Sequence, residues 1–248
     1  MMKLIQLTCV LMGLFAHAQN TENLLKTHFN PTHLQGFETN IVYSRVTIFN
    51  REFGLHDSKI ASIFKLQDRP FQVAYQQYGY EHFKESKYSI STVQNLNSKM
   101  NLGVNLNFHH LGITDSENLK ALSFDIGYSY KSEKYEIRLF LENPLNSKYI
   151  ENDLESRFIV SGEYYWNSNL FSGLQLEESI HTGFKASHQF GYSYKDYLSL
   201  SILQSIHPLE YGFRVAYKKE RVQLYSQYQI LTWTNSTGFA LIYQLAND

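Results

Sequence analysis

The chain has 248 residues, a formal net charge of -1 and a pI near 6.8. This balance gives no electrostatic reason to bind nucleic acid or a strongly acidic partner, so we predict no nucleic-acid partner. Aromatic residues make up 15% of the chain, with 19 Tyr and 17 Phe against 4 Pro, a mixture that favours strands because aromatic side chains pack well on a pleated surface.

Residues 1–18 have the features of a secretory signal peptide. Lys3 precedes an apolar stretch that ends at Phe15, and Ala16-His17-Ala18 matches the small-x-small pattern of a cleavage site. The apolar stretch is shorter than the ~20 residues that a membrane-spanning helix needs. Cys9, the one cysteine, lies inside this segment. We therefore predict a mature chain with neither a disulfide nor a thiolate metal site.

Residues 19–37 precede the first predicted strand, and we expect them to enter the lumen of a barrel from its periplasmic side. Their apolar side chains are too many for a freely solvated tail, and a barrel of about fourteen strands is wide enough to need filling. We expect Phe29 and Leu34 to pack inside the lumen. Pro31 sets a bend and Asn30 caps it through its side chain. Together, Phe29, Asn30, Pro31 and Leu34 are the predicted luminal plug or gate.

From Thr39 onward the dominant pattern is an alternation of apolar and polar residues, which is typical of β-strands. The connectors are short and polar, and no linker or shift in composition divides residues 38–248, which we predict to be one domain. About fourteen runs follow this pattern. They centre near Val42, Ile63, Val73, Ile90, Val104, Ile126, Ile137, Ile159, Leu174, Phe190, Leu200, Phe213, Tyr225 and Leu241.

Alternation alone does not say which face is wet, because a soluble sandwich hides its apolar face and a membrane barrel presents it to lipid. The runs fit the length of a tilted membrane strand, about 9–11 residues, better than the usual soluble strand of about 5–6. Tyr and Phe also cluster toward strand ends, as in Tyr164-Tyr165-Trp166, where an interfacial girdle would lie. We predict an all-β fold, an antiparallel transmembrane β-barrel of about 14 strands with a short N-terminal luminal segment. The predicted location is the outer membrane of a Gram-negative bacterium, and a secreted soluble β-sandwich is the alternative.

A set of charged residues falls on the predicted inward faces of consecutive strands. Unpaired charge inside a barrel is costly, so we expect cross-strand pairing among its members. Stabilisation of the lumen is the favoured interpretation, and a polar path or a clamp for the N-terminal plug is the functional one. The set consists of Asp125, Glu136, Arg138, Glu142 and Glu163.

No motif in the sequence indicates catalysis. His109 and His110 are neighbours on a strand and so point to opposite faces, which prevents them from chelating one metal together. The chain contains neither a G-x-S-x-G elbow nor a Gly-rich phosphate loop. We predict no catalytic residue, no metal site, no cofactor and no enzymatic activity.

The pentapeptide GYSYK occurs at residues 127–131 and again at 191–195. Each copy ends one predicted strand and is followed by a short turn and another strand. A closed antiparallel barrel is built from such hairpins. We therefore interpret the repeat as hairpin structure rather than as a duplicated binding site.

The segment "FNPTHLQGF" (residues 29–37) resembles the Asn-Pro-Ala-Gly motif that precedes the barrel in fatty-acid-transporter-like (FadL superfamily) outer-membrane proteins, although Thr32 and His33 replace the Ala and Gly. The stretches "FQVAYQQYGYEHFKESKYSIS", "KMNLGVNLNFHHLGI" and "LSFDIGYSYK…LENP" are similar to the PorV/PorQ-type branch. This resemblance implies a fourteen-stranded barrel with its N-terminal segment tucked into the lumen. Family members act in uptake of hydrophobic molecules or as accessories of type IX secretion.

Two functional classes follow from the pattern and the resemblance. In the first, the protein is a non-enzymatic outer-membrane barrel that binds or passes small hydrophobic molecules, with Asn30-Pro31 gating the lumen. In the second, it is an accessory subunit of an outer-membrane secretion complex (type IX-like) or assembly complex. The predicted partners are outer-membrane lipid and either a hydrophobic small molecule or a larger outer-membrane complex.

Overall fold

The computed structural model describes residues 30–35, 37, 40–50, 54–114, 118–149, 153–195, 197–231 and 234–245. The predicted signal peptide (residues 1–18) and Phe29 lie outside these residues. The elements are η1 (Pro31–Leu34), β1 (Ile41–Asn50), β2 (Leu55–Leu66), β3 (Arg69–Tyr80), β4 (Phe83–Asn95), β5 (Met100–Ile113), β6 (Leu119–Lys131), β7 (Tyr135–Glu142), β8 (Arg157–Tyr165), β9 (Leu170–Ser179), β10 (Gly183–Tyr194), β11 (Leu198–Ile206), β12 (Glu210–Lys219), β13 (Val222–Ile230) and β14 (Asn235–Gln244).

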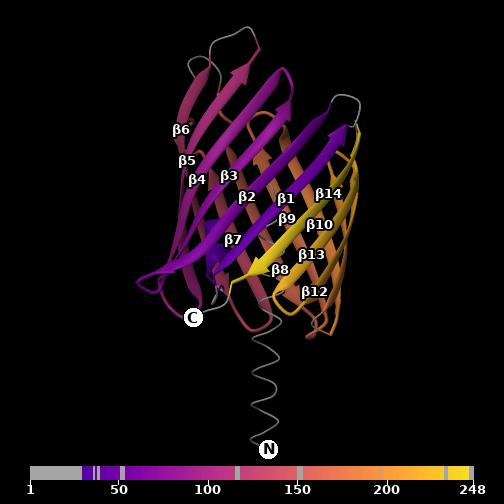
Figure 1. The fold of residues 1–248 in the computed structure, drawn as a ribbon. Coiled ribbons are helices and arrows are strands. Elements are labelled where there is room, and N and C mark those ends of the chain that lie inside the picture. Colours follow the sequence, from indigo (N-terminus) through magenta and orange to yellow (C-terminus); the bar gives the residue numbers. More distant parts are fainter. Residues whose placement is uncertain are drawn as a thin grey trace, which may run out of the picture.

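The fourteen strands form one closed antiparallel barrel. Each strand pairs with the next along the chain, and β1 closes the ring against β14 in a register that runs from Ile41 opposite Gln244 to Ile48 opposite Thr237. Because the number of strands is even, β1 begins at the same end of the barrel at which β14 finishes (Figure 1). This topology confirms the predicted all-β, fourteen-stranded fold, and each predicted strand centre falls in its own strand. A closed ring replaces the alternative two-sheet sandwich.

The alternating sequence pattern determines which side chains point into the barrel. On β5, Asn105 and Asn107 are buried inside the barrel, whereas the alternating residues Val104 and Leu106 are exposed on the outer wall. Leu106 is 58% exposed. The same phase holds on the other strands, so the outer wall is apolar and the inner wall is largely polar. This is the reverse of a soluble protein and the arrangement expected of a barrel in lipid.

Aromatic side chains line the barrel end at which β1 begins. Tyr130 stacks on Tyr135 with ring centroids 5.9 Å apart, and Tyr164 contacts Trp166 edge-on at 5.0 Å. Further along the same end, Tyr197 contacts two more tyrosines, on β10 and β12. Such a belt fits the predicted interfacial girdle. Tyr165, however, points inward, where its hydroxyl donates to the Glu163 carboxylate at 2.9 Å.

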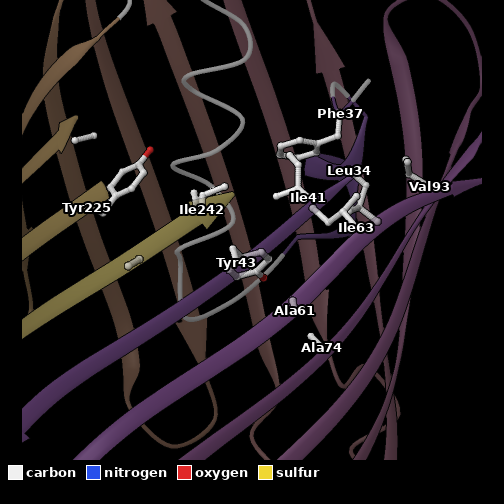
Figure 2. Packing of buried hydrophobic residues seen from close by; sticks show 12 residues of the cluster. Leu34, Phe37, Ile41, Tyr43, Ala61, Ile63, Ala74, Val93, Tyr225 and Ile242 are labelled. Atoms are coloured by element: carbon white, nitrogen blue, oxygen red, sulfur yellow. The ribbon is translucent and has the colours of Figure 1, made fainter. Parts of the chain in front are cut away.

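A buried apolar cluster lies inside the lumen at this same end, beside β1 to β4 and β12 to β14. Leu34 and Phe37 of the N-terminal segment pack toward Ile41, the first residue of β1, and toward Ile63, its partner on β2 (Figure 2). Tyr43 lies beside them, with 1% of its surface exposed and its hydroxyl accepting from the Gln72 amide at 2.8 Å. This cluster anchors the N-terminal segment to the barrel wall.

Among the residues that the structure describes, no helix is long and apolar enough to cross a membrane.

Candidate functional site

The candidate site is the lumen, and its first component is the N-terminal segment. Residues 30–34 are buried and lie against β3, β4, β5 and β6. Asn30 is the N-cap of η1, where its Oδ1 accepts from the backbone N–H and hydroxyl of Thr32 at 3.0 and 2.8 Å. Pro31 is the first residue of η1, a position that suits its fixed φ. The amide of Asn30 donates to the carbonyl of Leu139 at 3.2 Å, which ties the segment to β7 as well.

Two glycines of the barrel wall make room for this segment. Gly103 and Gly127 lie directly opposite each other on β5 and β6. A Cβ added at Gly103 would meet Pro31 at 2.8 Å, and one added at Gly127 would meet Oδ1 of Asn30 at 2.0 Å. Any side chain at either position therefore collides with η1. We call the contact between Asn30-Pro31 and these two glycines the glycine saddle.

The second GYSYK copy uses its glycine in the same way for a different group. Gly191 points into the lumen, and a Cβ there would lie 2.2 Å from the ring of Phe171. Phe171 is opposite Gly191 on β9 and is buried. In each copy of the repeat, the glycine has no Cβ and therefore leaves room on the inner wall for a group that packs against it.

The predicted set of five charged residues divides into two groups. Arg138 is 3% exposed and bridges two carboxylates, with its Nη2 2.7 Å from Glu136 and its Nη1 3.0 Å from Glu163. Glu136 and Glu163 face each other on β7 and β8, so the arginine between them offsets their repulsion. This group follows the cross-strand pairing that the sequence predicts, and its functional role stays a prediction.

Asp125 and Glu142 form the second group, opposite each other on β6 and β7. Asp125 Oδ2 accepts from the side-chain amides of Asn105 and Asn107 at 3.1 and 2.9 Å. Glu142 lies 3.5 Å from Nζ of Lys87. These residues and their neighbours on β2 to β5 leave a space of only about 20 Å³ between them. The lumen beside β2 to β7 is therefore packed with hydrogen-bonded polar side chains.

Residues 143–149 and 153–156 of the β7–β8 connection fold onto this packed region from the opposite end to η1. The Asn143 backbone N–H donates to Asp125 Oδ1 at 3.2 Å. Its side-chain amide donates to the carbonyls of Ser147 and Leu154 at 3.2 and 3.3 Å. Asn143 thus links the loop to the charged lumen. Sequence reasoning missed this residue, although the Asn-Pro pair at residues 143–144 was a signal for a turn.

Tyr149 of the same loop makes a second contact with the barrel. Its hydroxyl donates to Glu85 on β4 at 3.0 Å, and its ring lies edge-on to the buried His109 at 6.4 Å. Burial and the neighbouring carboxylate raise the pKa of Tyr149, so the phenol remains a hydrogen-bond donor at neutral pH. His109 points inward and is the more buried of the histidine pair, as the strand argument predicts. Within the described residues, no group of His, Cys, Asp and Glu has the arrangement of a metal site.

The other side of the lumen is open. A cavity of about 470 Å³ lies beside β8 to β13, with Asn30 and His33 of η1 contributing to its boundary. Its wall carries three ion pairs: Arg138–Glu163, Arg157–Glu177 at 3.4 Å and Lys185–Glu210 at 2.5 Å. The uncharged polar lining residues include Ser161, Gln175, Ser187, Gln189, Gln227 and Gln229, and the apolar ones include Phe140, Ile159, Leu203 and Leu231. Apart from Asn30, Arg138 and Glu163, these residues are missing from the predicted site, although alternation marks the inward positions.

No protein-family model matches the chain, and no curated protein matches its sequence. Among solved structures, the barrel is similar to a deltaS2S3 mutant of the TodX monoaromatic hydrocarbon channel, with a TM-score of 0.67 at 9% identity over 87% of this chain and 92% of that chain. The P. putida toluene transporter TodX gives 0.63 at 9% identity over 88% and 93%. The KdgM porin gives 0.50 at 9% identity over 83% and 99%. At such identities the likeness shows the fold alone. The chain thus shares the closed antiparallel barrel fold of these channels and porins.

Proposed function

We propose that this protein is a non-enzymatic outer-membrane β-barrel that binds or passes small molecules through its lumen. The observation that carries the proposal is the combination of a closed barrel, an apolar outer wall and an internal cavity with a mixed charged, polar and apolar lining, bounded on one side by the N-terminal segment. The printed names of the similar structures, a channel, a transporter and a porin, support it by analogy of fold.

The proposed location is the outer membrane of a Gram-negative bacterium, with lipid as the partner of the outer wall. Large apolar side chains such as Leu106 and Ile90 are more than half exposed at mid-strand, and a wall of this kind is stable only in contact with lipid or detergent. Fractionation with the outer membrane and a gel mobility that changes on heating are the expected results. Recovery as a soluble periplasmic monomer would end the proposal.

Within this function, the N-terminal segment acts as a luminal plug. The glycine saddle and the hydrogen bond from Asn30 to the Leu139 carbonyl hold η1 against the wall. Leu34 has no exposed surface, so leaving the lumen exposes an apolar side chain to water at a cost of about 1.5–3 kcal/mol. The segment therefore stays docked until something displaces it.

The resemblance to FadL and PorV/PorQ-type barrels carries two finer proposals. One is a hydrophobic cargo, which agrees with the hydrocarbon and toluene in the TodX names. The other is an accessory role in type IX-like secretion or in assembly. A specific feature favours the second: the outer wall is hollowed by about 520 Å³ around β1 and β12 to β14, where Ser44 and Ser226 lie among larger apolar side chains. A partner subunit that docks here would contact the barrel from outside.

Purification from native membranes in mild detergent separates these roles. A stoichiometric large partner that is lost on Ser226→Trp substitution, which fills the hollow, supports the accessory role. The outward-facing Tyr228→Trp, on the same strand, is the matched control that leaves the hollow unfilled. A barrel that is isolated alone and conducts ions in planar bilayers supports the channel. Protein that folds, binds no partner and conducts nothing refutes both.

A further inference from the structure

We infer that the route through the lumen runs beside β8 to β13 and accepts uncharged hydrophilic solutes with several hydroxyl or amide groups, such as small sugars. This inference deepens the proposed channel function and depends on it. It replaces the hydrophobic cargo with a polar one, on the grounds of what lines the cavity.

The two sides of the lumen differ in how completely they are filled. Beside β2 to β7, η1 lies against β3 to β6, and polar side chains such as Gln72, Lys87 and Asn107 leave almost no space. Beside β8 to β13 a cavity of about 470 Å³ remains, and Gly162 and Gly173 contribute no side chain to its lining. This open space fixes where a solute passes.

The uncharged lining suits a solute that both donates and accepts hydrogen bonds. Ser161, Gln175 and Ser187 lie directly opposite one another across β8, β9 and β10. Gln227 and Gln229 point into the same cavity from β13. Serine hydroxyls and glutamine amides offer donors and acceptors together. Hydroxyl groups of a sugar find both partners along this band, and apolar side chains beside it, such as Phe140, Ile159 and Leu203, suit the C–H face of a sugar ring.

The charged lining disfavours both ions and hydrocarbons. Each of the three ion pairs on the cavity wall places a cation within 3.5 Å of a carboxylate. Two further cations line the cavity: Arg45 pairs with Asp57, and Arg214 donates to Gln227 at 2.9 Å. Most of the charge on the wall is therefore compensated locally, and no strong field of one sign concentrates an ion. A hydrocarbon would strip water from these groups without replacing its hydrogen bonds, which is costly. A neutral hydrophilic solute escapes both penalties.

Proteoliposome swelling with the full mature protein tests the inference. We expect D-arabinose to enter proteoliposomes faster than protein-free liposomes. Ser187→Trp places an indole in the cavity and should return the rate to the protein-free level. Ala186→Trp is the matched control, because its neighbouring position faces lipid, and it should leave the rate unchanged. A gel mobility that changes on heating, as in the wild type, shows that each variant is folded.

The outcomes distinguish the inference from the function on which it rests. If bilayers show potassium chloride current and D-arabinose enters in the wild type but not in Ser187→Trp, the inference holds. If current is present but D-arabinose does not enter, or if toluene blocks the current and D-arabinose does not, the polar cargo is wrong and the channel stands. If neither current nor D-arabinose passes, with or without residues 20–36, the proposed channel itself fails.

Discussion

Gly127→Ala should release the N-terminal segment without disturbing the barrel. The new Cβ would lie 2.0 Å from Asn30 Oδ1, 2.9 Å from Asn30 Cγ and 3.0 Å from Pro31 Cδ. Asn30 has little freedom to turn away, because its amide and carbonyl groups are both used in hydrogen bonds. Pro31 is blocked in turn by the backbone at Gly103. The clash is therefore relieved by η1 lifting off the wall.

The expected size of this effect follows from overpacking. Extra methyl groups in a tight contact cost about 1–3 kcal/mol, which corresponds to an undocked population increased by about 5–150-fold. Alanine suits a strand interior better than glycine by about 0.5–1 kcal/mol, so β6 itself should not weaken. The Gly127→Ala substitution should therefore stabilise strand β6 of the wall and destabilise the docked position of η1.

Single-channel recording in planar bilayers is the assay. Gly127→Ala should spend more time in the high-conductance state than the wild type. Gly212→Ala is the control, because its Cβ meets Gln229 and Leu203 at ordinary contact distances of 3.5 Å, and it should match the wild type. Equal open fractions in all three folded proteins would show that η1 is not the barrier.

Three further substitutions test the wall and its contacts. Arg138→Ala leaves its two partner carboxylates buried and unpaired, and should lower the free energy of unfolding by about 3–5 kcal/mol in urea titrations; a change below 1 kcal/mol would show that the group is already well hydrated. Asn143→Ala removes its side-chain hydrogen bonds to the β7–β8 loop and should cost about 1–3 kcal/mol, with faster proteolysis at residues 143–156; unchanged cleavage would contradict the loop anchor. Leu106→Arg, at mid-strand on the outer wall, should cost about 2–4 kcal/mol in lipid vesicles. Leu145→Arg, 71% exposed in a loop, should cost almost nothing, and equal costs would refute the membrane orientation.

The sequence was sufficient for the strands because each strand carries its own period-two pattern. On β6, Leu122 points outward and Ser123 inward as alternation requires, and no other part of the chain changes that phase. The same local pattern marks Phe140 as inward, between Arg138 and Glu142, and the structure buries it there at 3% exposure. Local patterns of this kind are readable before any tertiary contact is known.

Cross-strand partners were less accessible, because register depends on turn geometry. After the first GYSYK, Lys131 pairs with Glu136 across residues 132–135. After the second, Tyr194 pairs with Leu198 across residues 195–197. This one-residue difference changes which positions of the following strand face outward, and pairings such as Arg138 with Glu163 depend on such shifts. The repeated pentapeptide alone cannot supply them.

The glycine saddle and the cavity were not predictable from one stretch of sequence. Gly103 and Gly127 matter only because η1, about seventy to a hundred residues earlier in the chain, lies on them. The cavity in turn exists because η1 lies against β3 to β6 and leaves the space beside β8 to β13 open. Both features depend on how the strands close into a barrel, and the alternating pattern does not predict which segment lies inside the lumen.

The plug is tested by comparing the ion conductance of the purified mature protein with that of a variant lacking residues 20–36, in planar bilayers at the same protein density. Both proteins should assemble as barrels, and the deletion variant should have the larger and more persistent conductance, because the lumen loses η1 while the ladder of β1 against β14 remains intact. If the deletion changes neither conductance nor thermal stability, the N-terminal segment is not a plug.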